Sequence, residues 1–195
     1  MTLDIEFEVP TWIQIYEMLS SLAAKIRGDN FSPDIIVGVC RGGWPPAKII
    51  SSLLGNVNLA KVTVEFYSGV AKSNKEPVLT QPISIPVTGM SVLIIDDVAD
   101  TGKTLNLVKK HLSKKRASSV RIATIYLKPW STVTPNYYKK ETDHWIVFPW
   151  ERREAFRNLI EDFRVEEVKK RLVEDGMDKD LVKSFIEEIL DEDSK

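Results

Sequence analysis

The chain has 195 residues, a length at which one domain with a small appendage is expected. Hydrophobic residues make up 43% and charged residues 28%, which argues against disorder and against a fibre. The charges of the 27 basic and 28 acidic residues nearly cancel, so the net charge argues against a nucleic-acid partner. No apolar run is long enough to span a membrane, which argues against a membrane partner. The single cysteine, Cys40, excludes an internal disulfide, and the acidic N-terminus is unlike a signal peptide. We therefore expect a soluble cytoplasmic protein.

Hydrophobic periodicity predicts alternating helices and strands over the first 150 residues. The first elements in chain order are a helix over 12–27 capped by Thr11, a strand over 34–40 and a helix from Pro45. Strands over 61–67 and 91–95 follow. The last elements of this part are a helix that begins at 101–104 and strands over 120–127 and 144–147. Residues 68–89 contain three prolines and little periodicity, which favours a long functional loop, the natural lid of a site. The alternation predicts an α/β fold with a mostly parallel central sheet flanked by helices.

The composition changes near Trp150. Residues 151–195 have a net charge of −5, but their apolar side chains recur at helical spacing, with a break at Gly176. We expect residues 1–151 to form the main domain and residues 152–195 to form a charged, amphipathic helical extension. Such an extension would pack on the main domain or on a partner subunit.

Residues 92–104 carry the pattern that predicts chemistry. A buried strand ends in Asp96 and Asp97, and a short loop then leads into a helix N-terminus. Backbone N–H groups over 99–104 can converge on an anion there, with help from the helix dipole and two threonine hydroxyls. The adjacent carboxylates suit sugar hydroxyls and Mg²⁺, because carboxylates accept from O–H groups and Mg²⁺ prefers oxygen ligands. The stretch therefore predicts a site for a phosphorylated ribose.

Two other interpretations of this stretch are a P-loop and a purely structural helix cap. A P-loop requires a glycine five residues before Gly102, and that position is Asp97. A capped helix with surface acids is the purely structural alternative. The pair of acids comes directly after four apolar residues, and Asp100 and Thr101 follow shortly after the pair. This order favours the ligand site over the structural alternative.

The stretch resembles the phosphoribosyl-diphosphate (PRPP) signature of the type I phosphoribosyltransferases. Three more segments agree with that family, and they are closest in motif to its purine (xanthine-guanine and hypoxanthine) members. These segments are Val-Cys-Arg-Gly-Gly over 39–43, Lys128-Pro129, and Trp145-Ile146 followed by Phe-Pro-Trp over 148–150. The resemblance spans about residues 33–151.

The resemblance implies a role for each matching residue. Asp100 would take or share the N7 proton of the purine, and Asp97, with Asp96 beside it, would face the ribose hydroxyls and the Mg²⁺ cofactor. The residues implied for the 5′-phosphate are Ala99, Thr101, Gly102, Lys103 and Thr104; those for diphosphate are Arg41 and Gly42; those for the base are Lys128, Trp145 and Ile146. The structural alternatives are a loop-capping aspartate for Asp100, a surface side chain for Arg41 or Lys128, and core packing for Trp145.

Lys128 bears on the choice of base. Its ammonium donates hydrogen bonds and accepts none, so it suits the O6 of hypoxanthine, guanine or xanthine and not the amino group of adenine. The implied activity is that of a Mg²⁺-dependent purine-salvage enzyme, a homodimer or homotetramer. It would convert PRPP and a 6-oxopurine into the nucleoside 5′-monophosphate and diphosphate. An adenine phosphoribosyltransferase and a non-catalytic PRPP-sensing regulator are the alternatives.

Overall fold

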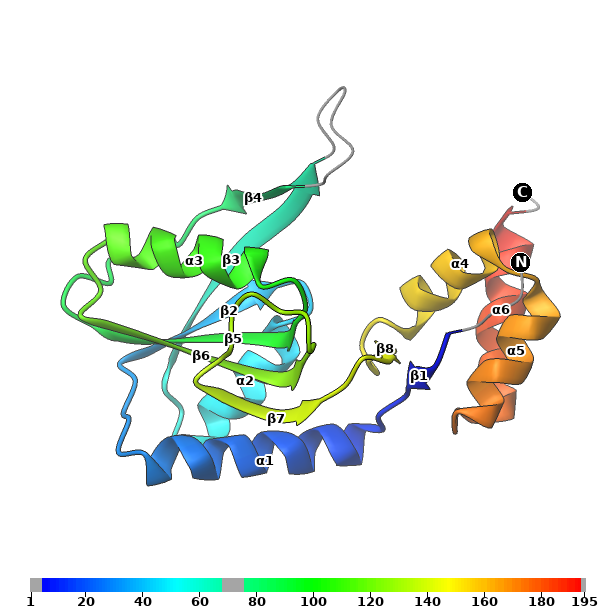
Figure 1. Ribbon diagram of the computed structural model, residues 1–195, viewed down its shortest axis with the longest axis horizontal. Helices are drawn as coiled ribbons and strands as arrows, with labels where there is room; N and C mark the ends of the chain where they lie inside the picture. Colours follow the sequence, from blue (N-terminus) through cyan, green and yellow to red (C-terminus); the bar gives the residue numbers. More distant parts are fainter. Residues whose placement is uncertain (1–4, 68–75, 194–195) are drawn as a thin grey trace. The chain divides into compact units, whose positions relative to one another are not determined.

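The computed structural model describes residues 5–67 and 76–193 (Figure 1). The chain forms two compact units. One unit is Ile15–Asp143, and the other combines Met1–Gln14 with His144–Lys195.

The unit Ile15–Asp143 is built on a six-stranded sheet. The order of its strands is β4-β3-β2-β5-β6-β7, and every pairing is parallel except that of β4 with β3. The strands are β2 (Ile35–Cys40), β3 (Asn58–Tyr67), β4 (Glu76–Gln81), β5 (Ser91–Ala99), β6 (Ser119–Leu127) and β7 (Tyr137–Glu141). This mostly parallel sheet confirms the predicted α/β fold.

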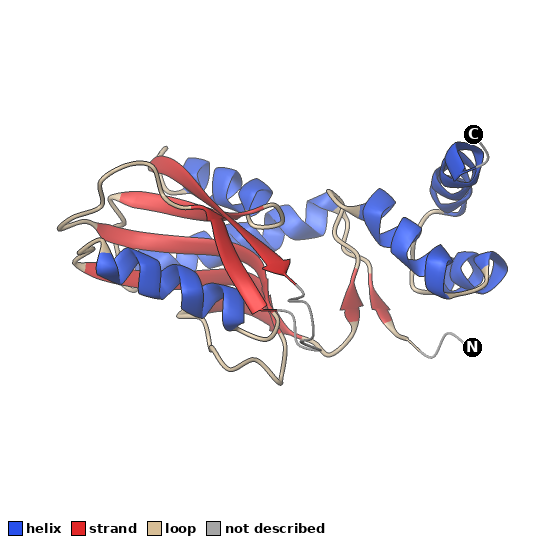
Figure 2. Ribbon diagram, turned by 90° about the horizontal axis from the view of Figure 1, so that it is seen from above, coloured by secondary structure: helices blue, strands red, loops and turns tan. Residues whose placement is uncertain are grey.

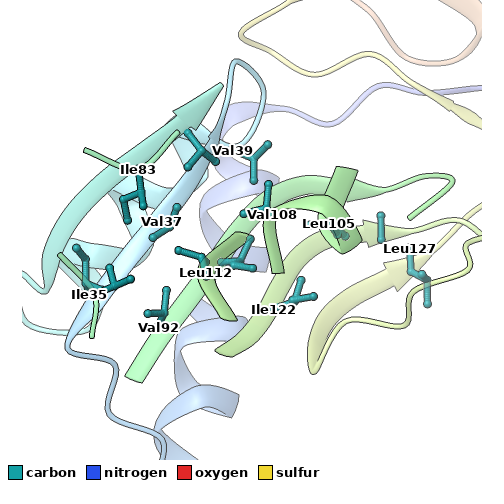
Figure 3. Close-up of a cluster of buried hydrophobic side chains, with 14 residues drawn as sticks. Ile35, Val37, Val39, Ile83, Val92, Leu105, Val108, Leu112, Ile122 and Leu127 are labelled. Atoms are coloured by element: carbon teal, nitrogen blue, oxygen red, sulfur yellow. The ribbon is translucent and has the colours of Figure 1, made fainter. Parts of the chain in front are cut away.

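Helices cover both faces of this sheet (Figures 1 and 2). Helix α3 (Lys103–Lys114) lies on one face, whereas α1 (Trp12–Gly28) and α2 (Trp44–Leu53) lie on the other. Figure 3 shows Leu105, Val108 and Leu112 of α3 beside the branched side chains of the strands. Because alternate side chains of a strand point to opposite faces, strands covered on both sides must be apolar throughout, as β2 is.

The unit that contains both termini has a small sheet and three helices. Strand β1 (Phe7–Glu8) pairs in parallel with β8 (Trp145–Ile146). Helices α4 (Arg152–Asp162), α5 (Val165–Glu174) and α6 (Lys179–Asp193) follow, and Gly176, at φ +98°, lies between the last two. Phe7 and Val147 are buried with side chains from all three helices, so the β1–β8 pair and the helices share one core.

Several elements differ from those predicted from the sequence. Residues 76–81 form β4 and not part of a loop, while residues 68–75 lie outside the described residues. Strands β1 and β7 were not predicted, and β8 pairs with β1 and not with the central sheet. The compact units also do not follow the composition change at Trp150, because residues 144–151 group with the helices that follow them. Whether residues 1–151 fold as a domain stays a prediction.

In the stretches 5–67 and 76–193, no helix combines the length and apolar character needed to cross a membrane.

Candidate active site

The parallel strands β2, β5 and β6 deliver three segments to one edge of the sheet. These strands end at Cys40, Ala99 and Leu127 and are neighbours in the order β2-β5-β6. The chain crosses to opposite sides of β2 to form β3 and β5, so the strand order reverses at the β2–β5 boundary. In open parallel sheets, ligands bind beyond the carboxyl ends of the strands at such a point. The predicted site residues that follow β2, β5 and β6 therefore lie where a ligand site is expected.

A cavity of about 190 Å³ opens at this edge. Its lining comes mainly from the end of β5 and the loop into α3, and it includes these predicted site residues: Asp96, Asp97, Asp100, Thr101, Gly102 and Thr104. Asp96 and Asp97 are each only 8% exposed, and Asp96 Oδ1 accepts a hydrogen bond of 3.1 Å from the Asp97 N–H. Phe66, half exposed at the end of β3, also lines the cavity. The sequence did not single out Phe66.

The loop after β2 lies directly against the carboxylate of Asp97. A Cβ atom added at Gly42 would come within 1.9 Å of Asp97 Oδ2, and one added at Gly43 would lie 2.6 Å from the Ile95 carbonyl oxygen. A side chain at position 42 would therefore displace the Asp97 carboxylate, and one at position 43 would clash with the backbone of β2 and β5. The Asp97 carboxylate is held from its own strand as well, because Oδ1 accepts a hydrogen bond of 2.7 Å from the Val98 N–H.

Around this loop the backbone has one unusual feature. The peptide bond between Cys40 and Arg41 is cis. Arg41 is exposed, and burial raises the pKa of the Cys40 thiol. The raised pKa disfavours the thiolate, which is the reactive form of cysteine.

The loop between β5 and α3 has the geometry of an anion cradle. Gly102 adopts φ +80° immediately before α3, a backbone conformation that favours glycine. The N–H groups of the first helical turn follow, and that of Lys103 donates to Thr101 Oγ1 at 3.4 Å. The Lys103 ammonium lies 2.9 Å from Glu76 Oε1 on β4. Ala99 is fully buried, and its carbonyl oxygen accepts a hydrogen bond from the Lys128 N–H.

Lys128 and Trp130 follow β6 and reach the same edge. The Lys128 side chain is 8% exposed, and its ammonium lies 5.3 Å from the centroid of the Trp130 ring. The Trp130 indole Nε1–H donates a hydrogen bond of 2.8 Å to Asp100 Oδ1. The sequence did not identify Trp130, although its place directly after Lys128-Pro129 was a usable signal.

Comparison with known proteins agrees with this geometry. Residues 11–157 match the family described as the phosphoribosyl transferase domain. The chain belongs to this family. The xanthine-guanine phosphoribosyltransferase of Cereibacter sphaeroides is 31% identical over 146 residues, which cover 72% of this chain and 84% of the relative. That of Gluconobacter oxydans is 29% identical over 154 residues, covering 78% and 89%.

Solved structures support the same assignment. The purine phosphoribosyltransferase from Pyrococcus horikoshii is 41% identical, with a TM-score of 0.68, and the match covers 75% of this chain and 94% of that one. The Helicobacter pylori xanthine-guanine-hypoxanthine phosphoribosyltransferase, at 17% identity and a TM-score of 0.66, covers 79% and 100% and shows the fold alone. The chain is thus a phosphoribosyltransferase, an enzyme of the glycosyltransferase class.

The residues of this phosphoribosyltransferase predicted to contact the base fall in both units. Lys128 belongs to Ile15–Asp143, whereas Trp145 and Ile146 form β8 in the other unit. Trp145 is 48% exposed, so it is not a core residue. Its backbone N–H donates a hydrogen bond of 2.9 Å to the Glu6 carbonyl oxygen. Ile146 is buried. A role in base binding stays a prediction for both residues.

The donor set of the cavity fits a magnesium ion that the substrate helps to hold. Among residues 5–67 and 76–193, no three His, Cys, Asp or Glu side chains cluster closely enough to hold a metal ion by themselves. Mg²⁺ is commonly bound through one or two carboxylates together with substrate phosphates and water. Asp96 and Asp97, both lining the cavity, supply carboxylates of that kind.

Proposed function

We propose that this phosphoribosyltransferase transfers the 5-phosphoribosyl group of PRPP to N9 of a 6-oxopurine in purine salvage. The products are the nucleoside 5′-monophosphate and diphosphate. The observation that carries the choice of base is the buried Lys128 ammonium at the end of β6, beside the cavity-lining loop. A buried donor without acceptor capacity favours the O6 of hypoxanthine, guanine or xanthine over the amino group of adenine.

The loop from β5 to α3 binds the 5′-phosphate in this proposal. The backbone N–H groups and hydroxyls of Thr101 and Thr104 donate to phosphate oxygens, and the N-terminus of α3 favours the negative charge. Gly102 allows the backbone to approach the phosphate. Ala99 begins the loop, and its carbonyl oxygen accepts a hydrogen bond from the Lys128 N–H. Lys103 directly follows the same loop as the first residue of α3, and Glu76 offsets the charge of its ammonium at the rim.

The two buried carboxylates bind the sugar. Asp97 and Asp96 accept hydrogen bonds from the ribose 2′ and 3′ hydroxyls. They would also hold Mg²⁺, which supplies positive charge to the diphosphate as it leaves. Arg41 and the Gly42 N–H lie after the neighbouring strand β2, where Gly42 is packed against Asp97, and they bind the diphosphate oxygens.

The protein accelerates the reaction by positioning and by proton transfer. Fixing N9 of the base in line with C1′ and the departing diphosphate oxygen removes most of the entropic cost of bringing them together. As N9 attacks, electron density leaves the imidazole ring, and the N7 proton becomes acidic. Asp100, at the cavity rim, accepts that proton.

The remaining parts of the proposal concern the base and the assembly. Trp145 supplies a flat face for stacking and the Ile146 carbonyl oxygen accepts from a purine N–H; these roles rest on the resemblance of their segment. We also propose a cytoplasmic homodimer or homotetramer. The exposed apolar side chains of Trp12 and Ile13 support self-association, which sedimentation velocity would measure.

Diphosphate release tests the proposal directly. The purified protein is mixed with PRPP and Mg²⁺, and adenine, hypoxanthine, guanine and xanthine are supplied in parallel. Turnover with one or more 6-oxopurines and little with adenine is the expected result. Preference for adenine would overturn the choice of base. Release with none of the four bases, together with measurable PRPP binding, would favour a PRPP sensor instead of an enzyme.

A further inference from the structure

Trp130 touches both side chains that the proposed function assigns to one edge of the purine. Its indole Nε1–H donates to Asp100 Oδ1 at 2.8 Å. Its ring lies 5.3 Å from the Lys128 ammonium, within the range of a cation–π contact. Asp100 follows β5 and Lys128 follows β6, so the indole connects the ends of two neighbouring strands.

The chemistry of the base explains why such a connection matters. The N7 and O6 atoms of a 6-oxopurine lie on the same edge of the ring. Lys128 would donate to O6 while Asp100 takes the proton at N7. The two protein groups must therefore be held at a fixed spacing from each other to meet one rigid edge. Free rotation of either side chain would cost part of the advantage of a positioned site.

The loop that carries Trp130 is itself fixed to the phosphate loop. The Thr132 N–H and hydroxyl both donate to the Thr101 carbonyl oxygen, at 3.2 and 2.7 Å. A Cβ atom added at Gly102 would come within 2.8 Å of Thr132 Oγ1, so the two loops are in close contact there. Trp130 is 53% exposed, and an exposed indole gains little from packing. Its orientation is therefore set by the contacts with Asp100 and Lys128 and by the fixed loop.

On the basis of the proposed function, we propose that Trp130 is a positioning residue that orients Asp100 for proton transfer and fixes Lys128 against the base. The indole N–H binds Oδ1, which leaves the second oxygen of the carboxylate to receive the N7 proton. The indole face holds the Lys128 ammonium beside the same edge of the base. Trp130 takes no proton and forms no bond to the substrate.

Two substitutions separate the two contacts. Trp130→Phe removes the N–H donor but keeps an aromatic face for Lys128, whereas Trp130→Leu removes both. In Trp130→Phe we expect kcat to fall about tenfold to a hundredfold, the range for a lost hydrogen bond to a charged group, with the KM for PRPP and for the base unchanged. In Trp130→Leu we expect the KM for the 6-oxopurine to rise in addition. Tyr16→Phe is the matched control, because it also removes a polar group from a half-exposed aromatic side chain, and Tyr16 lies on α1 and does not line the cavity.

A double-mutant cycle shows whether Trp130 acts through Asp100. In the Asp100→Asn background, Trp130→Phe should cause no further loss of kcat. A full, independent loss in that background would overturn the positioning role, and so would unchanged kcat in the single variant. A gain in kcat/KM for the base in Trp130→Leu would mean that the indole blocks the base, which also overturns it.

The wild-type protein decides the proposed function separately. If it turns over a 6-oxopurine and the Trp130 variants match it, the proposed function stands and the role of Trp130 falls. If it turns over none of the four bases, the proposed function falls, and the role of Trp130 falls with it. Calorimetric titration with PRPP checks the fold of each variant, since the phosphate loop and Asp97 are left intact.

Discussion

Asp100 is the residue whose chemical role is easiest to isolate. Asparagine has the same shape, and its amide oxygen can still accept the hydrogen bond from Trp130, so the loop should keep its structure. The side chain loses its ability to take a proton. We expect kcat of Asp100→Asn to fall by ~10²–10⁴-fold with unchanged PRPP affinity, measured by steady-state kinetics and calorimetry. Asp191→Asn, at an exposed position on α6, is the control. Wild-type turnover in Asp100→Asn would remove this residue from the mechanism.

Lys128 carries the prediction about the base. A buried ammonium facing O6 makes a charge-assisted hydrogen bond of roughly 1.5–3 kcal/mol, and facing the amino group of adenine it opposes donor to donor. Glutamine offers both a donor and an acceptor. Lys128→Gln should therefore narrow the kcat/KM ratio of hypoxanthine to adenine by about tenfold or more.

Both bases are measured on the wild type, on Lys128→Gln and on Lys110→Gln, an exposed lysine of α3. An unchanged ratio in Lys128→Gln would show that Lys128 does not recognise the base. A changed ratio in Lys110→Gln would show that the effect is one of general charge.

At the scale of residues, the three aspartates predicted for the site line one cavity. Asp96 and Asp97 lie near the end of the apolar strand β5 and Asp100 directly follows it, and the end of a buried parallel strand leads to a ligand cleft. Trp130 was missed because its role depends on a contact with Asp100, thirty positions away in the chain. Hydrophobic periodicity does not report such a contact, and the usable local signal was the place of Trp130 directly after Lys128-Pro129.

The loop after β2 shows how an element constrains the site. A Cβ atom at Gly42 would lie 1.9 Å from Asp97 Oδ2. This distance is far below the van der Waals contact distance of two non-bonded atoms, so one of them must move. Gly42→Ala should push the Asp97 carboxylate from its position and weaken PRPP binding in calorimetry. Gly28→Ala, at the end of α1 with nothing within 4 Å of the new methyl group, is the control and should bind PRPP as the wild type does. Equal affinity in both variants would contradict the assignment of Asp97 to the sugar.

Strands β4 and β7 show why some elements were not predicted. Both are edge strands, at the two ends of the sheet order. An edge strand needs no continuous apolar run, and it tolerates proline, as β4 does at Pro77. β7 has mostly exposed side chains after Tyr137 and contains two lysines. Their sequences therefore lack the hydrophobic period that identified the central strands β2, β5 and β6.

At the scale of the whole molecule, composition and packing divide the chain differently. Charge density rises after Trp150, which reflects the solvated faces of α4, α5 and α6. The core of that unit also takes Phe7 and Val147 from outside the charged segment. Phe7 lies in the two-residue strand β1 and Val147 directly follows the two-residue strand β8, and segments this short leave no compositional trace. The sequence could predict helices there but not which residues cover them.

Truncation after residue 151 tests this division. Removal of residues 152–195 takes away Phe156, Leu172 and Ile186, against which Phe7 and Val147 are buried. The β1–β8 pair then loses its hydrophobic cover, and a lone two-stranded sheet is marginal in water. The cavity takes all of its lining from Phe66 and residues 96–105. We therefore expect the truncated protein to bind PRPP in calorimetry as the full chain does, while its KM for the base rises because Trp145 and Ile146 are no longer held in place.

Phe156→Asp in the full-length chain is the matched variant, since it places a charge in the same core without shortening the protein. It should reproduce the rise in the KM for the base and the retained PRPP affinity. A truncated protein that still unfolds cooperatively but no longer binds PRPP would show that the helices complete the PRPP site. In that case the predicted boundary between residues 151 and 152 would be wrong, because the cavity would need more than the residues that line it.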